Sequence, residues 1–380
     1  MKILITGGHL SPALSVINEL KNENILYVGR KYALEGDKVF SLEYQTIKNL
    51  GIPFYSLTTG RLQRKFTKYT VPSFFKLPFG FSQSLYILKR FKPDIVLGFG
   101  SYVSLPVIIA AYFLKIPVVI HEQTLEAGVA NKIAGRFAVK ICVSWNSSIR
   151  FFPKNKTILT GNPLRKEIIE MANSIHSTGS GQEWKMANSQ KKDLPLLYIT
   201  GGSLGSHFIN NLIKDSLSQL INKFQIVHQT GDAKQYKDFD NLIKLKEEIG
   251  ENAKNYTLKK FLSPAETAEY LKKADLVVSR AGINTVTEIL FLEKPSLLIP
   301  LPFSQGNEQL KNAQFLKRQG LGEVLEQRKA TPDIFIQTLE RMFDNLGEYK
   351  TQSQDLVGKN TAVKIVEVIK NVYKKKKNKK

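Results

Sequence analysis

Two passages of this chain share one local plan, in which a short apolar run leads into paired glycines and then into a helical pattern. The first passage, ILITGGHLSPAL, starts at Ile3, and the second, LLYITGGSLGSHF, starts at Leu196. Glycines after a strand let the backbone turn tightly and approach a ligand closely. Because the plan occurs once in each half, the sequence predicts two α/β units that each open on such a loop.

The remaining sequence alternates apolar runs with helical patterns, which predicts a mostly parallel, doubly wound sheet in each half. Strands are predicted at residues 25–28, 54–57, 94–98, 117–121, 139–143 and 157–159, and then at 224–228, 256–261, 276–279 and 296–300. Helices are predicted near residues 234–249 and 264–272 in the second half. A length of 380 residues also favours two domains over one.

The boundary is predicted near Thr160-Gly161-Asn162-Pro163, where the first half ends. Residues 1–163 would form the first domain and residues 164–345 the second. Residues 173–193 are polar, rich in Gly and Ser and without pattern, so they are predicted to be a flexible insertion. Residues 346–373 are predicted to hold the C-terminal helix, and residues 374–380 to form a disordered basic tail.

Composition favours a cytosolic globular protein. A single cysteine, Cys142, excludes an intramolecular disulfide and points to a reducing compartment. The N-terminus lacks the apolar core of a signal peptide. The most apolar run, residues 105–120, is broken by Lys115 and Pro117 and is too short to span a bilayer.

A formal net charge of +22 admits three explanations: lysine-rich composition alone, nucleic-acid binding, or binding to an anionic membrane surface. No nucleic-acid module is evident, so no nucleic-acid partner is expected. Residues 61–92 mix phenylalanines with Lys and Arg, which suits docking at a membrane interface. The same segment could instead hold a core helix at residues 82–91 with a basic outer face.

The stretch from Ser279 to Ala313 predicts the end of a strand, a turn, a helix at residues 282–292, a strand and a second helix at residues 306–319. In a parallel sheet this turn lies at the carboxyl edge, and the helix N-terminus suits a diphosphate. Glu288, further along the helix, would accept hydrogen bonds from the two hydroxyls of a ribose. The stretch is equally compatible with an ordinary turn followed by a glutamate on the helix surface.

The same stretch closely resembles the nucleotide-sugar site of MurG-type glycosyltransferases, and ordered motifs extend the resemblance over most of residues 2–319. The matching motifs are Thr6-Gly7-Gly8-His9, Gly98 to Pro106, His121-Glu122-Gln123 with Gly128 and Asn131, Thr160 to Pro163 with Arg165, Gly201-Gly202-Ser203, Arg280-Ala281-Gly282 with Thr285 and Glu288, and Gln309 with Asn312-Ala313. The resemblance implies the GT-B fold, two Rossmann-like doubly wound domains facing a cleft, with the donor mostly on the second. It also implies that the C-terminal helix, predicted within residues 346–373, packs back on the first domain.

The family transfers N-acetylglucosamine from UDP-GlcNAc to an undecaprenyl-pyrophosphoryl muramyl-peptide, with inversion, at the cytoplasmic face of the cell membrane. By resemblance His9 would be the general base, with Glu122 as the second candidate, and Tyr102 and Gln123 would position the acceptor. The other residues implied in substrate binding are Thr6, Gly7, Gly8, Thr124, Asn131, Arg165, Ser203, Leu262, Arg280, Gly282, Ile283, Asn284, Thr285, Val286, Thr287, Glu288 and Gln309.

Three departures from the family pattern affect the first half. The first glycine loop is shorter than usual, Thr124 stands where the family has Asn after His-Glu-Gln, and Gly100-Ser101 replaces a Gly-Gly pair. A related glycolipid transferase with a different acceptor therefore stays possible. The sequence is also compatible with a non-hydrolysing UDP-GlcNAc 2-epimerase, which has the same architecture, and with a non-catalytic basic binding protein.

No cofactor and no metal are expected, because the five histidines have no ligand-like spacing. Asp238-Phe239-Asp240 does match the Asp-x-Asp metal signature of another glycosyltransferase class. It lies in a polar helical stretch among lysines, so the sequence favours a solvated helix face instead.

Overall fold

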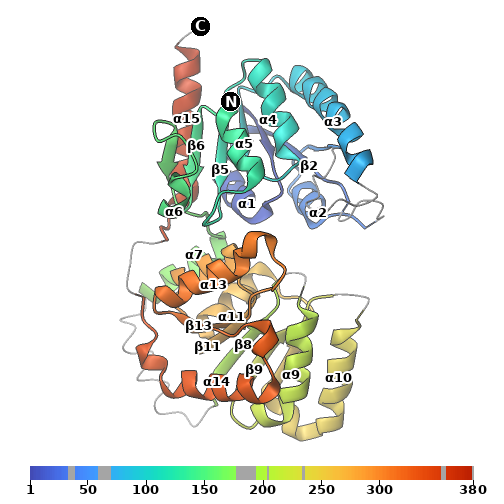
Figure 1. The fold of residues 1–380 in the computed structure, drawn as a ribbon, viewed down its shortest axis with the longest axis vertical. Helices are drawn as coiled ribbons and strands as arrows, with labels where there is room; N and C mark the ends of the chain where they lie inside the picture. Colours follow the sequence, from blue (N-terminus) through green and yellow to red (C-terminus); the bar gives the residue numbers. More distant parts are fainter. Residues whose placement is uncertain are drawn as a thin grey trace. The chain divides into compact units, whose positions relative to one another are not determined.

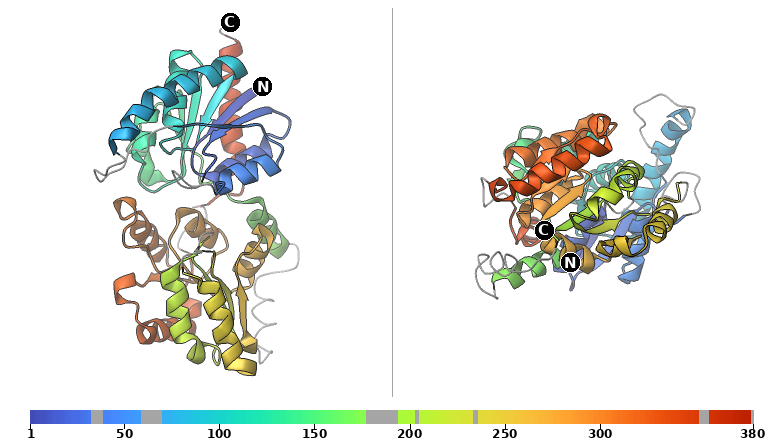
Figure 2. Two further views of the ribbon diagram at one scale, coloured as in Figure 1. Left: turned by 90° about the vertical axis from the view of Figure 1, so that its right-hand side faces the viewer. Right: turned by 90° about the horizontal axis from the view of Figure 1, so that it is seen from below.

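The computed structural model describes residues 1–32, 39–58, 70–176, 194–202, 205–232, 236–351 and 357–378. The chain divides into two compact units, the N-terminal unit (Met1–Leu164 with Gly358–Lys380) and the C-terminal unit (Arg165–Val357). Within the described residues each unit is built on a parallel sheet with helices on both faces (Figures 1 and 2). The predicted doubly wound α/β class is therefore confirmed.

The described sheet of the N-terminal unit has seven strands in the order β3-β2-β1-β4-β5-β6-β7. They are β1 Lys2–Thr6, β2 Asn24–Gly29, β3 Phe54–Ser56, β4 Ile95–Gly98, β5 Val118–Glu122, β6 Lys140–Val143 and β7 Thr157–Leu159. The helices are α1 Leu10–Glu19, α2 Leu42–Asn49, α3 Thr70–Phe91, α4 Ser104–Phe113, α5 Val129–Phe137, α6 Asn146–Ile149 and α15 Thr361–Lys377. Because β1 lies between β2 and β4, the winding reverses at the carboxyl end of β1, where ligands bind in such sheets.

Burial explains why the strands of this sheet are continuous apolar runs. Ile3, Leu4 and Ile5 of β1 are fully buried, since helices cover both faces of the parallel sheet. Apolar residues of α3, α4 and α5 pack on one face. Residues of α1 and α2 pack on the other face, together with Ile365 and Ile369 of α15. The last helix of the chain thus completes a core that the first strand begins.

The described sheet of the C-terminal unit has six strands in the order β10-β9-β8-β11-β12-β13, and it reverses at β8. They are β8 Leu196–Thr200, β9 Gln225–Gln229, β10 Tyr256–Lys259, β11 Leu276–Ser279, β12 Ser296–Leu298 and β13 Gly322–Val324. The α-helices are α7 Lys166–His176, α9 His207–Leu220, α10 Asp238–Ile249, α11 Pro264–Lys273, α12 Ile283–Phe291, α13 Glu308–Arg318 and α14 Pro332–Asp344. Short 3₁₀ turns are η1 Gly250–Asn255, η2 Gln305–Asn307, η3 Gln327–Lys329 and η4 Leu346–Glu348.

Two boundary predictions need correction, and one strand was not predicted. The first four residues of the predicted insertion, 173–176, continue α7, and residues 177–193 lie outside the described part. Residues 374–377 of the predicted disordered tail form the last turn of α15, because lysines are good helix formers and suit the negative end of the helix dipole. The strand β13 was not predicted, since Gly322–Val324 has no apolar run.

Candidate functional site

The loop after β8 lies pressed against the loop after β9. A Cβ added at Gly205, where φ is +77°, would lie 1.8 Å from the Thr230 carbonyl oxygen, and one at Gly201 would lie 2.2 Å from the Ser206 amide nitrogen. Glycine alone fits such contacts. Ser206 then caps α9, because its Oγ accepts a hydrogen bond from the Ile209 amide. The loop therefore brings the positive end of α9 to the point where the winding of the sheet reverses.

Arg280 follows β11 and lies at the same edge. Its Nε donates to Ser206 Oγ at 2.9 Å, and its Nη1 donates to the Ile299 carbonyl oxygen at 3.0 Å. Among the described residues no carboxylate forms an ion pair with it, and burial lowers the pKa of Arg280 to about 10. The guanidinium remains charged at neutral pH, so this edge carries a cation that the described protein does not neutralise. Together with the N-terminus of α9 it forms a site suited to an anion.

Glu288 projects from α12, which begins after Gly282. Its carboxylate is buried and is held by Arg165, whose Nε and Nη2 donate to Oε1 and Oε2 at 2.7 Å each. This bidentate geometry sets the orientation of the carboxylate. A carboxylate offers about four lone-pair positions, so about two remain for other donors. Arg165, predicted to bind substrate, here holds Glu288, the residue expected at the ribose.

The other predicted residues of α12 divide between two faces of the helix. Ile283, Val286 and Thr287 are buried, and Thr287 Oγ1 donates to the Ile283 carbonyl oxygen at 2.7 Å. Their side chains face the core of the unit. A ligand at this edge would therefore contact the backbone of the first turn of α12 and not these side chains. Asn284 and Thr285 are half-buried.

The residues after β10 and β12 complete this edge. Gln309 Oε1 accepts a hydrogen bond from the Leu301 amide at 2.9 Å, which holds the loop after β12 against α13. Leu262 is half-buried in the short connection between β10 and α11. Ser203 lies outside the described residues. Asn312 was not predicted as a site residue, yet it is fully buried and donates to the Ala281 carbonyl oxygen at 3.0 Å, so it supports the turn before α12.

In the N-terminal unit the loops after β1 and β4 also pack backbone against backbone. A Cβ added at Gly7, where φ is +146°, would lie 2.8 Å from the Phe99 carbonyl carbon, and one at Gly8 would lie 2.8 Å from Ser101 Cβ. The first turn of α1 therefore lies at the reversal point of this sheet. The predicted residues that gather at this edge are Thr6, Gly7, Gly8, His9, Tyr102, Glu122, Gln123, Thr124 and Asn131.

His9 lies beside Gln123, with His9 Nδ1 2.7 Å from the side-chain amide nitrogen. Burial lowers the pKa of His9, and the negative charge of Glu122 raises it by less. The imidazole is therefore neutral near pH 7, which is the form that accepts a proton. If Nδ1–H donates to the amide oxygen of Gln123, then Nε2 is the acceptor; if Nδ1 accepts from the amide nitrogen, Nε2 carries the hydrogen.

Glu122 is buried and its carboxylate is occupied by donors of the following loop. Oε1 contacts the Thr124 amide at 2.9 Å and Thr124 Oγ1 at 2.6 Å. Oε2 accepts from the Gly128 amide at 2.9 Å and from Asn131 Nδ2 at 3.0 Å. Thr124 Oγ1 also lies 2.6 Å from the Glu126 carbonyl oxygen. These contacts favour a structural role for Glu122 and Thr124.

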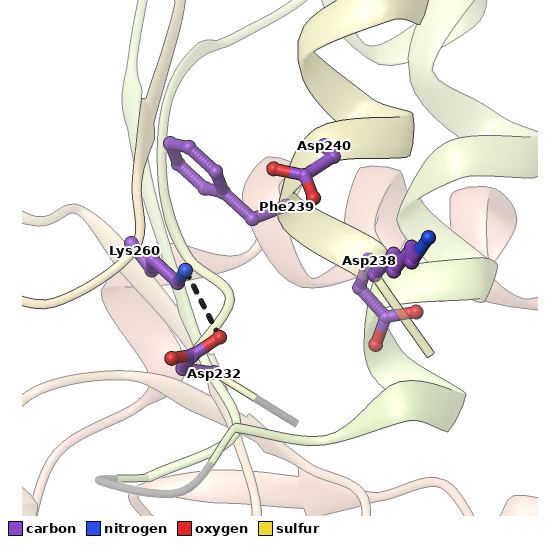
Figure 3. Close-up of a pocket in the computed structure, with 7 residues that line it drawn as sticks. Asp232, Asp238, Phe239, Asp240 and Lys260 are labelled. Atoms are coloured by element: carbon purple, nitrogen blue, oxygen red, sulfur yellow. Dashed lines mark ion pairs between the residues drawn. The ribbon is translucent and has the colours of Figure 1, made fainter. Parts of the chain in front are cut away.

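A separate cavity of about 220 Å³ in the C-terminal unit contains none of the predicted site residues (Figure 3). It is lined by Gly231, Asp232, Lys237, Asp238, Phe239, Asp240 and Lys260. The prediction that Asp238 lies on a solvated face is wrong: it is buried and accepts hydrogen bonds from His207 at 2.7 Å and Asn210 at 2.8 Å. In the part of the chain that the structure describes, no group of three His, Cys, Asp or Glu side chains could hold a metal ion.

Known protein families match both halves of the chain. The family described as "Glycosyltransferase family 28 N-terminal domain" matches residues 6–143, and "Glycosyltransferase family 28 C-terminal domain" matches residues 196–376. A protein of Clostridium botulinum is 34% identical over 98% of this chain and 99% of its own length. One of Clostridium tetani is 32% identical over 98% of both. Both are named UDP-N-acetylglucosamine–N-acetylmuramyl-(pentapeptide) pyrophosphoryl-undecaprenol N-acetylglucosamine transferase.

Solved structures agree with this match. The crystal structure of Acinetobacter baumannii MurG is similar with a TM-score of 0.71 and 25% identity, over 97% of this chain and 99% of that one. A UDP-GlcNAc 2-epimerase from Neisseria meningitidis is similar with a TM-score of 0.60 and 16% identity, over 98% of this chain and 100% of that one. The second likeness concerns the fold alone.

We expect Glu122→Gln to lower the free energy of unfolding by about 1–3 kcal/mol, because an amide nitrogen would face buried donors that now have an acceptor. Urea denaturation measures this change. Glu126→Gln, whose side chain is 45% exposed, is the matched control and should change stability little. Unchanged stability of Glu122→Gln together with abolished turnover would instead identify Glu122 as the base.

Proposed function

The chain belongs to glycosyltransferase family 28, and we propose that it transfers N-acetylglucosamine from UDP-GlcNAc to an undecaprenyl-pyrophosphoryl N-acetylmuramyl-peptide, which converts lipid I into lipid II in peptidoglycan synthesis. It is a hexosyltransferase of the GT-B fold. Arg280 carries the proposal, because it is a cation without a counter-charge among the described residues, beside the N-terminus of α9. A UDP leaving group departs with two negatively charged phosphates, which such a site stabilises.

The C-terminal unit would bind the donor. The diphosphate would contact Arg280, the first turns of α9 and α12, and Ser203. Glu288, held in orientation by Arg165, would accept hydrogen bonds from the ribose hydroxyls with its remaining lone pairs. The Leu262 backbone would contact the uracil. Gln309 would contact the sugar hydroxyls.

The N-terminal unit would supply the acceptor side of the reaction. An inverting displacement requires the acceptor 4-hydroxyl to lose a proton as it attacks the anomeric carbon, while the bond from that carbon to UDP breaks. His9 would take this proton on Nε2 when the Gln123 amide, whose nitrogen lies 2.7 Å from Nδ1, is turned so that its oxygen accepts Nδ1–H. Tyr102 would position the acceptor, and Glu122 would keep the loop after β5 in shape.

A lipid-linked acceptor requires contact with the membrane, and α3 and α4 offer a surface for it. Phe79, Tyr86, Tyr112 and Phe113 are all more than half exposed. Basic residues accompany these aromatic side chains, and Arg90 donates to the Tyr86 hydroxyl at 2.8 Å. Aromatic and basic side chains together suit the interface of an anionic bilayer. We therefore propose peripheral attachment at the cytoplasmic face; among the described residues no helix is long and apolar enough to span a membrane.

The predicted docking segment, residues 61–92, falls only partly within this surface. Residues 61–69 and the side chains of residues 70–77 lie outside the described part of the chain. Phe81 packs against the core, and Ile87 and Leu88 are buried, so the inner face of α3 is a core face. The exposed aromatic residues Phe79 and Tyr86 lie on the remaining face of the same helix.

The transfer reaction is tested by UDP release from UDP-GlcNAc with and without a soluble lipid I analogue. We expect release only with the analogue, and His9→Ala should lower kcat about 10²–10⁴-fold while UDP affinity is retained. Because the lowered pKa keeps His9 unprotonated to lower pH, activity should fall only as pH drops through that pKa, below the ordinary histidine value. Interconversion of UDP-sugars without acceptor would support an epimerase instead.

Arg280→Ala should weaken UDP binding roughly 10- to 100-fold, because a charge-assisted contact with phosphate is lost. Isothermal calorimetry with UDP measures the change. Arg318→Ala, which removes an exposed arginine of the same unit, is the control and should leave the affinity unchanged. Equal UDP affinity in all three proteins would contradict the proposed phosphate site.

The membrane surface is tested by sedimentation with anionic and zwitterionic liposomes. We expect salt-sensitive binding to anionic liposomes that falls at least several-fold in the double variant Tyr86→Ser/Phe113→Ser, because apolar area is lost from the interface. Ile334→Ser, at an exposed position of α14, is the control for added polarity. Absence of binding at low salt in the unaltered protein would contradict the docking proposal.

A further inference from the structure

Arg30 follows β2 directly and reaches a loop that lies two strands away in the sheet. Its Nη1 lies 3.4 Å from the Tyr102 hydroxyl, and its guanidinium carbon lies 5.6 Å from the centre of the Tyr102 ring. Tyr102 belongs to the loop after β4, and β1 lies between β2 and β4. The contact therefore passes over the carboxyl end of β1, where Gly7 and Gly8 form the glycine loop.

The positive charge of Arg30 has no ion-pair partner among the described residues. Its Nε is buried and, within the same residues, has no hydrogen-bond partner. Among the described residues the acid that contacts Arg30 is Glu43 of α2, which is 7% exposed. Glu43 Oε2 accepts the backbone N–H of Arg30, at 3.4 Å, while Oε1 has no partner in the described structure. The Arg30 guanidinium and the Glu43 carboxyl group thus belong to one cluster near the glycine loop, but no ion pair joins them within the described residues.

The charge of Glu43 changes in the physiological range. Burial raises the pKa of Glu43 to about 7, although the neighbouring Tyr27 hydroxyl, the Arg30 backbone N–H and the charge of Arg30 lower it in part. Tyr27 and Arg30 are the titratable or charged groups that face this carboxyl group within the described residues. Tyr27 also donates to the Gly7 carbonyl oxygen at 3.2 Å, which ties the cluster to the glycine loop. Below neutral pH the carboxyl group is neutral and Arg30 is left without a counter-charge.

We propose that Arg30 binds the diphosphate of the lipid-linked acceptor and that Glu43, through its own charge, sets how strongly Arg30 does so. The inference rests on the proposed function, which supplies an acceptor with a diphosphate next to the attacking sugar. A guanidinium forms paired hydrogen bonds with phosphate oxygens, and the first turn of α1 adds free N–H groups at the same edge. Tyr102 would then hold the side chain of Arg30 across the glycine loop.

Three variants test the assignment: Arg30→Gln removes the charge, Arg30→Lys keeps it, and Glu43→Gln makes the carboxyl position neutral at every pH. With the soluble lipid I analogue we expect Arg30→Gln to raise the acceptor KM about tenfold or more while the donor KM stays within about twofold. Arg30→Lys should recover part of the loss. Thermal unfolding checks that each variant is folded.

The pH dependence of the acceptor KM tests the role of Glu43 separately from that of Arg30. A diphosphate esterified at both ends keeps its charge across the neutral range, whereas Glu43 becomes negative as pH rises through about 7 and opposes anion binding. The acceptor KM should therefore rise with pH in the unaltered protein and stay flat in Glu43→Gln. A KM profile that is the same in both proteins would overturn the role of Glu43.

A binding experiment makes the inference independent of turnover. The experiment is a calorimetric titration of a short isoprenyl diphosphate, with UDP saturating the donor site. The unaltered protein should bind the isoprenyl diphosphate, and Arg30→Gln should bind it about tenfold more weakly or worse. If Arg30 only orients Tyr102, which would position the acceptor, the variant would impair turnover of the acceptor and leave this diphosphate affinity unchanged, which would overturn the proposal. Absence of UDP release in the unaltered protein, with diphosphate binding intact, would instead count against the proposed function alone.

Discussion

Contact of backbone with backbone at the carboxyl edge of each sheet is the constraint on which both candidate sites depend. In the C-terminal unit a side chain at Gly205 would begin 1.8 Å from the Thr230 carbonyl oxygen, and in the N-terminal unit one at Gly7 would begin 2.8 Å from Phe99. The loops lie this close because no side chain separates them at these glycines. That closeness brings the first turns of α9 and α1 to the reversal points of their sheets, where N–H groups and helix dipoles can act on a ligand.

Charge compensation then distinguishes the arginines at these edges. Arg165 is neutralised by Glu288 in a bidentate ion pair, so its role in the structure is to orient that carboxylate. Arg280 and Arg30 have no such partner among the described residues, and both are partly buried. A buried cation without an anion is costly, so these two arginines are suited to pair with an anionic ligand. Each unit thus presents one such arginine beside its glycine loop.

Much of this arrangement could be predicted from sequence, because apolar runs and glycine positions mark the strands and the turns after them. The helix predicted at residues 282–292 is α12, Ile283–Phe291, with Gly282 as its N-cap. The contacts of individual side chains were harder to predict from the sequence. The donors around Glu122 are mostly in a loop whose conformation follows from tertiary contacts. Asp238 was expected in solvent because its neighbours in the sequence are polar, yet it is buried and accepts a hydrogen bond from Asn210 on another helix. Sequence patterns report local spacing, whereas these contacts join distant segments.

The same limit applies to His9, the proposed base. The sequence identifies a histidine on the first glycine loop. A neutral imidazole can accept a proton at only one of its two ring nitrogens, and the hydrogen-bond partner of the other nitrogen decides which one that is. Gln123 lies 2.7 Å from Nδ1 of His9, and its amide can present either an oxygen or an NH₂ group there. Only the oxygen leaves the Nε2 lone pair available, while burial keeps the ring neutral by lowering its pKa. The orientation of one amide therefore decides whether His9 can take a proton, and Gln123 belongs with His9 as a positioning residue.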